Sequence, residues 1–244
     1  MSMNNTERKG LQNNSLRISQ FEKQIGYTFK EKFYLERALT HSSYNKEKNT
    51  KHQDNERLEF LGDAFLDAII AARIFNEMKG VREGRLTKIR ALVVCEKGLA
   101  KVAHNYRLGE YMFLGHGEEL AGGREKDSIL ADAMEAVIGA IYLDGGFEAT
   151  EKFVLESFEP IVKEAMEGKL FSDYKSQLQE ICQKNDKNSS ISYVIDREEG
   201  PDHDKTFYVS VYLKEAKIGS GTGKNKKEAE QDAAKAAIAA LERR

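Results

Sequence analysis

The chain has 244 residues, of which 40% are hydrophobic and 32% are charged, and its formal net charge is −2. This length allows one large domain or two smaller ones, with enough apolar residues for a real core. The small net charge excludes a bulk positive field, so nucleic-acid binding would have to depend on local clusters. No apolar run reaches the roughly 18 residues of a membrane span, and the polar N-terminus lacks a signal-peptide core. We therefore expect a cytoplasmic protein with no membrane partner.

Residues 1–15 are polar and Asn-rich, which predicts a disordered N-terminal extension. From residue 16 to residue 168, apolar residues recur three and four positions apart, and short glycine-containing breaks separate the segments. This pattern predicts an all-α domain. Cys95 and Cys182 are far apart and belong to no CxxC or Cys/His cluster. We interpret both as packing residues and predict neither a disulfide nor a zinc site.

Residues 55–64 read NERLEFLGDA and begin a helix that is predicted to be buried, because apolar residues cover most of its circumference. Its polar stripe is acidic. At about 100° per residue, four carboxylates fall within about 80° of one another: Glu56, Glu59, Asp63 and Asp67. Aligned carboxylates repel one another and lose solvation unless a cation or a proton compensates their charge. The stripe therefore indicates metal chemistry.

A second buried helix is predicted at residues 128–143, where Asp132 and Glu135 interrupt an apolar surface. Because they are three residues apart, the two carboxylates share one face. If the two acidic helices pack together, they form one cluster of four carboxylates: Glu59, Asp63, Asp132 and Glu135. Oxygen ligands in that number suit hard cations such as Mg²⁺ or Mn²⁺. The strongest alternative is that Arg57 and Arg90 neutralise the acids in buried salt bridges.

Three further residues near these acids have individual interpretations. Asn55 is predicted to cap the first acidic helix, with Asp54 as a competing choice. Gly62 lies in mid-helix, where glycine costs about 1 kcal/mol relative to alanine, so we expect a close approach to its backbone. His41, in the segment LTHSSY, has no second ligand nearby in the sequence. We interpret it as a structural, hydrogen-bonded residue.

After residue 168 the pattern changes to that of a small α-β-β-β-α module, joined to the first domain by a short hinge at residues 167–172. In its middle strand, Phe207, Val209 and Val211 alternate with polar or aromatic residues, as in a half-buried strand. The elements are predicted in the order helix, strand, strand, strand, helix: residues 173–183, 191–198, 206–213, 217–223 and 226–241.

The last helix of this module begins with three lysines, Lys224, Lys226 and Lys227. Cations are unfavourable at a helix N-terminus, which already carries partial positive charge. An external anion would compensate them, so the lysines and the exposed backbone N–H groups predict a phosphate clamp. The alternative is an ordinary solvated charge run.

Residues 55–64 resemble the signature of the ribonuclease III family, and residues 127–139 (DSILADAMEAVIG) resemble the second acidic motif of that family. The C-terminal module resembles the double-stranded RNA-binding domain. Together the resemblance covers nearly the whole chain, from about residue 18 to residue 241. It implies an all-α ribonuclease III catalytic and dimerisation domain at residues 16–168 and an α+β double-stranded RNA-binding domain at residues 172–242.

The resemblance implies a role for each acid. Asp63 and Glu135 would be catalytic, and the metal would be bound by the four carboxylates Glu59, Asp63, Asp132 and Glu135. Two divalent ions can activate a water and stabilise the charge on the attacking and leaving oxygens. Glu56 and Glu118 are possible outer-shell residues, with a surface or capping role as the alternative.

The resemblance also implies a homodimer, with Phe60 and Gly62 at the interface and Phe60 inserted into a pocket of the partner; the alternative for Phe60 is core packing. In the RNA-binding module, Gln179, Glu180 and Gln183 would contact one minor groove. His203, in the loop at residues 200–203, would contact the next minor groove, and Lys224, Lys226 and Lys227 would span the phosphates between them.

The function implied is that of a Mg²⁺-dependent endoribonuclease, a hydrolase that cuts double-stranded RNA and leaves 5′-phosphate and 3′-hydroxyl ends. Its expected substrates are precursors of ribosomal and transfer RNA and structured messenger RNA, and no small-molecule cofactor is expected. One rival is a non-catalytic regulator that binds double-stranded RNA. Another is a metal-dependent phosphatase or nucleotide hydrolase, which would have no use for an RNA-binding module.

Overall fold

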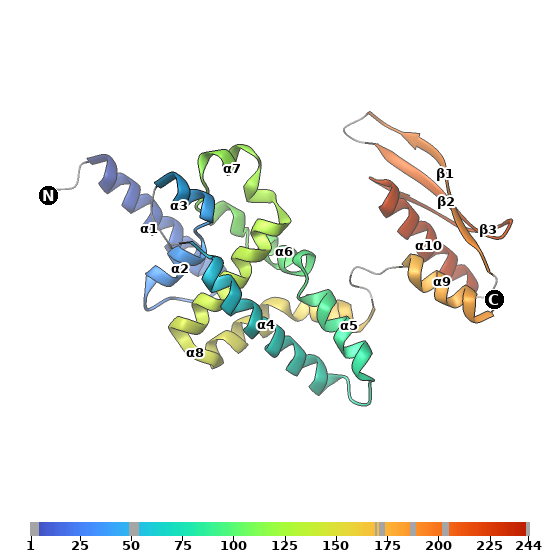
Figure 1. The fold of residues 1–244 in the computed structure, drawn as a ribbon, viewed down its shortest axis with the longest axis horizontal. Coiled ribbons are helices and arrows are strands. Elements are labelled where there is room, and N and C mark those ends of the chain that lie inside the picture. The colour runs from blue at the N-terminus through green and yellow to red at the C-terminus, as the bar shows by residue number, and fades with distance from the viewer. Residues whose placement is uncertain are drawn as a thin grey trace. The chain divides into compact units, whose positions relative to one another are not determined.

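The computed structural model describes residues 5–48, 54–168, 170, 174–185, 189–201 and 205–242 (Figure 1). The chain divides into two compact units, Met1–Leu170 and Phe171–Arg244, which we call unit 1 and unit 2. In the part of the chain that the structure describes, no helix is long and apolar enough to cross a bilayer.

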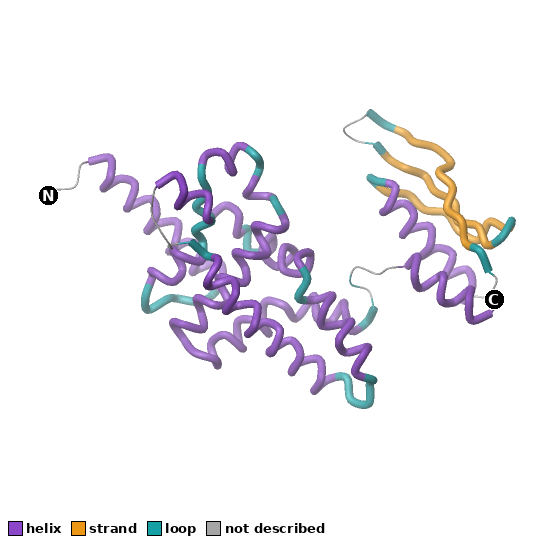
Figure 2. Tube along the Cα trace, in the orientation of Figure 1, coloured by secondary structure: helices purple, strands orange, loops and turns teal. Residues whose placement is uncertain are grey.

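The regular elements described in unit 1 are all helices (Figure 2). The one isolated bridge described joins Thr40 to Phe113. In chain order the elements are α1 (Asn5–Ile25), α2 (Lys32–Ala38), α3 (Ser42–Lys48), α4 (Glu56–Glu77), α5 (Glu83–Val93), α6 (Glu96–Asn105), η1 (Leu108–Tyr111), α7 (His116–Leu120), η2 (Gly123–Glu125) and α8 (Asp127–Met166). The prediction of an all-α first domain is confirmed.

Helix α1 begins at Asn5, within the N-terminal residues for which the sequence predicted a disordered extension. Further along this helix, Ile18 and Phe21 are buried in the core of unit 1. Once these residues fix a helical turn, each preceding residue can add one backbone hydrogen bond. Good helix formers such as Glu, Arg, Lys, Leu and Gln are present upstream, so a polar composition does not prevent the helix from extending.

Helices α4 and α8 form the centre of unit 1, and their backbones touch. A Cβ atom on Gly62 of α4 would lie 1.8 Å from the carbonyl oxygen of Glu135, and one on Gly139 of α8 would lie 2.3 Å from that of Leu58. Only glycine permits this contact. The predicted close approach to Gly62 is confirmed, but its predicted place in a dimer interface is wrong, because Gly62 is buried against α8 of its own chain.

Helix α8 is bent at Gly146, whose φ of 77° and ψ of −173° are outside the helical region and are accessible to glycine. The segment before the bend carries both Asp132 and Glu135, and its apolar residues are buried in the core, as predicted. The bend agrees with the sequence, in which Gly145 and Gly146 follow the apolar run.

Unit 2 has the predicted α-β-β-β-α order: α9 (Tyr174–Asn185), β1 (Ile191–Glu199), β2 (Thr206–Leu213), β3 (Ala216–Gly223) and α10 (Lys226–Glu242). The strands pair antiparallel in the order β1-β2-β3. Val209 and Val211 pack with Leu178, Cys182 and residues of α10, so both helices cover one face of the sheet (Figure 1). Cys182 is buried and Cys95 is half-buried, and both are free thiols, as predicted.

Candidate active site

The glycine contact between α4 and α8 brings the four predicted carboxylates to one place. Glu59 and Asp63 flank Gly62 on α4, and Glu135 is the residue whose carbonyl oxygen Gly62 approaches. Asp132 lies almost one turn before Glu135 on α8. The charges of Glu59, Asp63 and Asp132 all act on Glu135. Packing of α4 against α8 therefore brings the four predicted carboxylates close enough for their charges to interact.

The electrostatics of the cluster are those of uncompensated negative charge. Burial, followed by the charges of Asp63, Glu59, Asp132 and Asp67, raises the pKa of Glu135 to about 8. Burial and then the charge of Asp132 raise the pKa of Glu59. Burial also raises the pKa of Asp132, although the charge of His41 opposes that shift. At neutral pH the cluster holds a proton or needs a cation.

The salt-bridge alternative for these acids is wrong. Among the residues that the structure describes, no ion pair joins a basic side chain to any of the four carboxylates. Arg57 is exposed, and Arg90 Nε lies 3.6 Å from Asp67 Oδ1. Among the described residues of the stripe, Asp67 alone has an arginine partner, although its charge still acts on Glu135.

The donor set fits a hard divalent cation, because it consists of carboxylate oxygens without thiolates. Within the described residues, no three His, Cys, Asp or Glu side chains are grouped closely enough to hold an ion as they stand. The raised pKa of Glu135 makes this cluster a candidate site for a cation.

Glu118, a possible outer-shell residue, lies in the segment that joins η1 to α8. Its carboxylate pairs with Lys126, and this hydrogen bond lowers the pKa of Glu118. The charge of His41 also acts on Glu118. The other possible outer-shell residue, Glu56, is exposed at the start of α4, and its charge acts on Glu59.

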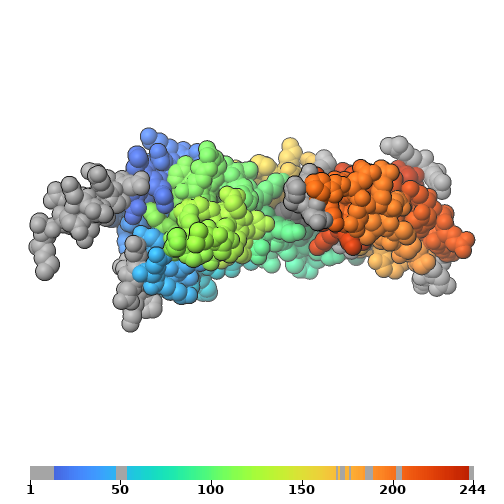
Figure 3. Space-filling view, turned by 90° about the horizontal axis from the view of Figure 1, so that it is seen from above, coloured from blue at the N-terminus to red at the C-terminus, as the bar shows by residue number. Residues whose placement is uncertain are grey.

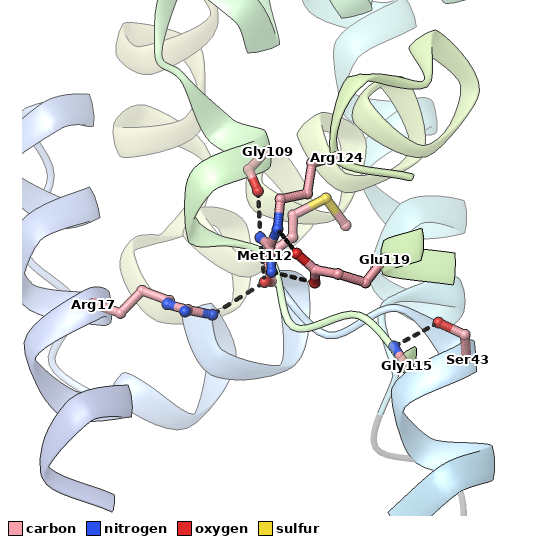
Figure 4. A network of polar contacts seen from close by, with 7 residues as sticks. All are labelled: Arg17, Ser43, Gly109, Met112, Gly115, Glu119 and Arg124. Carbon is pink, nitrogen blue, oxygen red and sulfur yellow. Dashed lines mark hydrogen bonds and ion pairs between the residues drawn. The ribbon is translucent and has the colours of Figure 1, made fainter. Parts of the chain in front are cut away.

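An arginine that the sequence analysis missed organises this segment (Figure 4). Arg124 Nη1 donates to the carbonyl oxygens of Gly109 at 2.6 Å and Met112 at 2.9 Å. Arg124 Nε and Nη2 donate to the carboxylate of Glu119, and Arg17 Nη1 donates to Met112 O at 3.2 Å. The sequence feature that could have indicated a role for Arg124 is its position, with Lys126, immediately before the helix that carries Asp132 and Glu135. In Figure 3 the yellow-green segment that carries α7 forms part of the surface of unit 1.

His41 is hydrogen-bonded, as predicted, but it is not remote from the acids. Its Nδ1 atom lies 2.8 Å from Ser43 Oγ and accepts the Ser43 backbone N–H at 3.3 Å. Its charge acts on both Asp132 and Glu118. In the sequence His41 resembles a lone histidine, because Glu118 and Asp132 lie 77 and 91 residues farther along the chain. Asn55, the predicted cap of α4, occupies that position without a side-chain capping hydrogen bond.

The predicted RNA-binding residues of unit 2 lie on two helices. Gln179, Glu180 and Gln183 are exposed on α9, and the three lysines, Lys224, Lys226 and Lys227, are exposed around the start of α10. The backbone N–H groups near these lysines were predicted to be free for phosphate, but some of them are hydrogen-bonded within the chain. Asn225 Oδ1 accepts the Glu228 N–H at 2.9 Å, and Glu228 Oε2 accepts the Lys224 N–H at 3.0 Å. These capping hydrogen bonds occupy N–H groups that had been assigned to phosphate. His203 lies outside the described residues.

Comparisons with known proteins agree with this architecture. The model of the ribonuclease-III-like family matches residues 31–161, and that of the double-stranded RNA-binding motif matches residues 174–241. Ribonuclease 3 of Caldanaerobacter subterraneus subsp. tengcongensis is 45% identical over 92% of this chain and 98% of its own length. Ribonuclease 3 of Syntrophomonas wolfei is 51% identical over 87% of this chain and 89% of its own.

A solved structure agrees as well. The nuclease domain of ribonuclease III from Campylobacter jejuni matches with a TM-score of 0.55 and 44% identity, over 59% of this chain and 96% of that domain. The chain therefore belongs to the ribonuclease III family and is an endoribonuclease specific for double-stranded RNA, with a helical nuclease domain followed by a double-stranded RNA-binding domain.

Proposed function

We propose that the four carboxylates Glu59, Asp63, Asp132 and Glu135 bind Mg²⁺, with Mn²⁺ as a substitute, and that this site cuts double-stranded RNA to leave 5′-phosphate and 3′-hydroxyl ends. The observation that carries the proposal is the pKa of Glu135, raised to about 8 by burial and by four neighbouring carboxylates, of which only Asp67 has a basic partner among the described residues. When bound, divalent ions polarise the scissile phosphate and activate water.

The four side chains differ in exposure, and the proposed roles follow that difference. Glu59, Asp132 and Glu135 are half-buried, whereas Asp63 is exposed. We assign the half-buried carboxylates to direct coordination, because loss of solvation makes a cation their strongest available partner. Asp63 can reach solvent, so its role is to orient the attacking water beside Glu135. Glu118, which is held by Lys126, and Glu56 would contact outer-shell waters.

Cleavage of a duplex RNA by Glu135→Gln tests this assignment, with Asp67→Asn as the matched control because Asp67 lies on α4 and pairs with Arg90. We expect Glu135→Gln to lose at least about 100-fold in rate while still binding the duplex in Ca²⁺. Asp67→Asn should cut at nearly the wild-type rate. Equal cutting by the two variants would exclude Glu135 from catalysis. Hydrolysis of mononucleotides by the wild type would favour a nucleotide hydrolase.

We propose that the protein is a homodimer, so that each of two sites cuts one strand. Phe60 on α4 is 80% exposed, which makes core packing the wrong interpretation for it. Farther along α4, Ala71 and Phe75 line an open groove together with Leu86 of α5. Phe60 of one protomer would enter this groove of the partner. In light scattering we expect Phe60→Ser to be monomeric at micromolar concentration. The control is Leu120→Ser, because Leu120 of α7 is 76% exposed, and this variant should remain dimeric.

In unit 2 we propose that the exposed residues of α9, Gln179, Glu180 and Gln183, contact one minor groove, that His203 contacts the next, and that the lysines at the start of α10 contact the phosphates between them. Such a module recognises the shape of A-form RNA more than its sequence. The proposed cellular substrates are therefore structured: precursors of ribosomal and transfer RNA and folded messenger RNA, in the cytoplasm. Sequencing of RNA ends with and without the enzyme tests these substrates.

A further inference from the structure

The first turn of α4, which carries Glu59, is attached to the end of α2. The backbone N–H of Asn55 donates to Thr40 O at 2.9 Å, and Arg37 Nε donates to Asp54 O at 3.1 Å. The end of α2 and the start of α4 therefore lie side by side (Figure 1). Asn55 O in turn accepts the backbone N–H of Glu59 at 2.9 Å. The position of Glu59 thus depends on how firmly Asn55 is held.

Two buried donors at this attachment have no acceptor among the residues that the structure describes: Arg37 Nη2 and Asn55 Nδ2. Asn55 is only 2% exposed, so its amide is shielded from bulk water. It occupies the N-cap position of α4 without a side-chain capping hydrogen bond, so capping does not explain why an amide is buried here. Buried donors without an acceptor are costly and rare in folded proteins. Each of these two therefore needs a partner.

The two donors belong to one place in the fold. Arg37 Nε already binds the carbonyl oxygen of Asp54, which is the peptide oxygen that immediately precedes Asn55. The carboxylate of Asp54 accepts Asn45 Nδ2 at 3.3 Å and supplies negative charge in the same segment as the Arg37 guanidinium. A second anion would be repelled by it. A neutral acceptor is favoured, and water suits a buried polar site with two or more partners.

We propose that Arg37 Nη2 and Asn55 Nδ2 share one buried water molecule as their acceptor, and that this site positions the first turn of α4 for metal binding. The consequence for metal binding rests on the proposed role of Glu59 as a ligand. With the water in place, Asn55 is held through both its backbone and its side chain, so the carbonyl oxygen that accepts the Glu59 N–H is fixed. Arg37 and Asn55 are positioning residues, because they act through the backbone of Glu59.

A carboxylate at position 55 tests whether the two donors face one site. Asn55→Asp replaces the amide donor with an acceptor that Arg37 Nη2 can use directly, so its midpoint in denaturant unfolding should stay near that of the wild type. In an Arg37→Met background the same carboxylate is buried without a cation, and Asn55→Asp should lower the midpoint strongly. An equal shift in both backgrounds would place the donors at separate sites and overturn the proposal.

A double-variant comparison tests the shared acceptor in another way. Asn55→Ala and Arg37→Met each remove one donor to the same water, so the double variant should lose less stability than the sum of the single losses. The control for Arg37→Met is Tyr106→Phe, which removes a part-buried hydrogen bond to Ser157 at 2.8 Å. Its effect should add to that of Asn55→Ala. Additive losses in both pairs would contradict a shared water.

Calorimetry with Mn²⁺ on the metal-free, full-length protein, without RNA, measures the effect on the metal site. We expect Asn55→Ala to bind Mn²⁺ about 10-fold more weakly. Asn55→Asp and the control Tyr106→Phe should bind like the wild type. Binding of duplex RNA in Ca²⁺ should be unchanged in all three variants. A folded Asn55→Ala variant with wild-type Mn²⁺ affinity would refute the positioning role.

The water itself can be detected in the wild type by a high-resolution crystal structure, which decides the proposal even if the variants fail to fold. We expect one ordered water within hydrogen-bond distance of both Arg37 Nη2 and Asn55 Nδ2. A direct bond from either donor to a protein oxygen would overturn the site. A wild type that holds this water but binds no Mn²⁺ and cuts no duplex refutes the proposed metal-dependent function. A wild type that does both without the water refutes only this inference.

Discussion

In both units a glycine lets two elements pack with their backbones in contact, but the charged side chains nearby are mostly half-buried in unit 1 and exposed in unit 2. In unit 1, Gly62 allows α4 to touch the backbone of α8, and the acids beside it are mostly half-buried. In unit 2, Gly221 of β3 lies against the backbone of α10, where a Cβ would be 2.1 Å from Ala233 N. There the lysines at the start of α10 are exposed. Half-buried acids respond to protons and metal ions, whereas exposed lysines respond to salt.

The largest effect is expected from Gly62→Ala. The added methyl group would overlap the Glu135 carbonyl at 1.8 Å, so the two helices must separate, and unit 1 should lose about 3 kcal/mol of stability. Denaturant unfolding measures this loss. The control is Gly84→Ala in α5, where nothing lies within 4 Å of the added atom and a gain of about 0.5–1 kcal/mol is expected. Equal stability of the two variants would contradict the backbone contact.

The corresponding change in unit 2 is Gly221→Ala. We expect this variant to lose duplex binding because α10 is displaced from the sheet, while the unfolding transition of unit 1 stays at its wild-type position. Gel-shift titration and calorimetric unfolding provide the two measurements. A normal affinity for duplex RNA would indicate that β3 and α10 tolerate the extra atom.

A smaller effect is expected from pH. Because the pKa of Glu135 is raised from 4.5 to about 8 in the folded state, the folded protein binds a proton that the unfolded chain has released between these values. Stability of the metal-free protein should therefore fall as the pH rises through this window, and the full loss is reached above about pH 8. Glu135→Gln should flatten the profile in thermal unfolding across pH 4 to 9, and an unchanged slope would contradict the raised pKa.

Metal binding should show the opposite trend over the same pH range. Protons compete with the cation for Glu135, so the affinity for Mn²⁺ should rise toward pH 8 in calorimetry. In the presence of saturating metal, the fall in stability with pH should become smaller, because the ion replaces the proton as the partner of the cluster.

The smallest effect is expected at the exposed lysines. Lys226→Ala and Lys227→Ala should each weaken binding to duplex RNA without loss of stability, and each should make the slope of log affinity against log salt shallower by about 1. Lys217→Ala on β3 is the control and should keep the wild-type slope. Slopes that remain unchanged in both α10 variants would remove these lysines from the RNA interface.

The part of the site that could be predicted from the sequence is the part that breaks a local rule. Glu59, Asp63, Asp132 and Glu135 interrupt helices that are otherwise apolar, and Gly62 is a poor helix former in mid-helix. Each anomaly is visible within one element. Arg124 and His41 break no local rule, because an arginine in a loop and a histidine beside serines are ordinary. Their partners, Gly109 and Met112 for Arg124 and Phe113 for His41, are known only once the segments have packed.

The order of the helices and strands, and the faces on which the acids and lysines lie, could be assigned from periodicity, because periodicity reports which residues share a side of one element. The tertiary structure alone decided which faces meet. It brought Gly62 against α8, paired Arg90 with Asp67 and attached the backbone of His41 to that of Phe113. Burial and charge coupling depend on distances between segments far apart in the chain, and the spacing of residues along the sequence carries no measure of those distances.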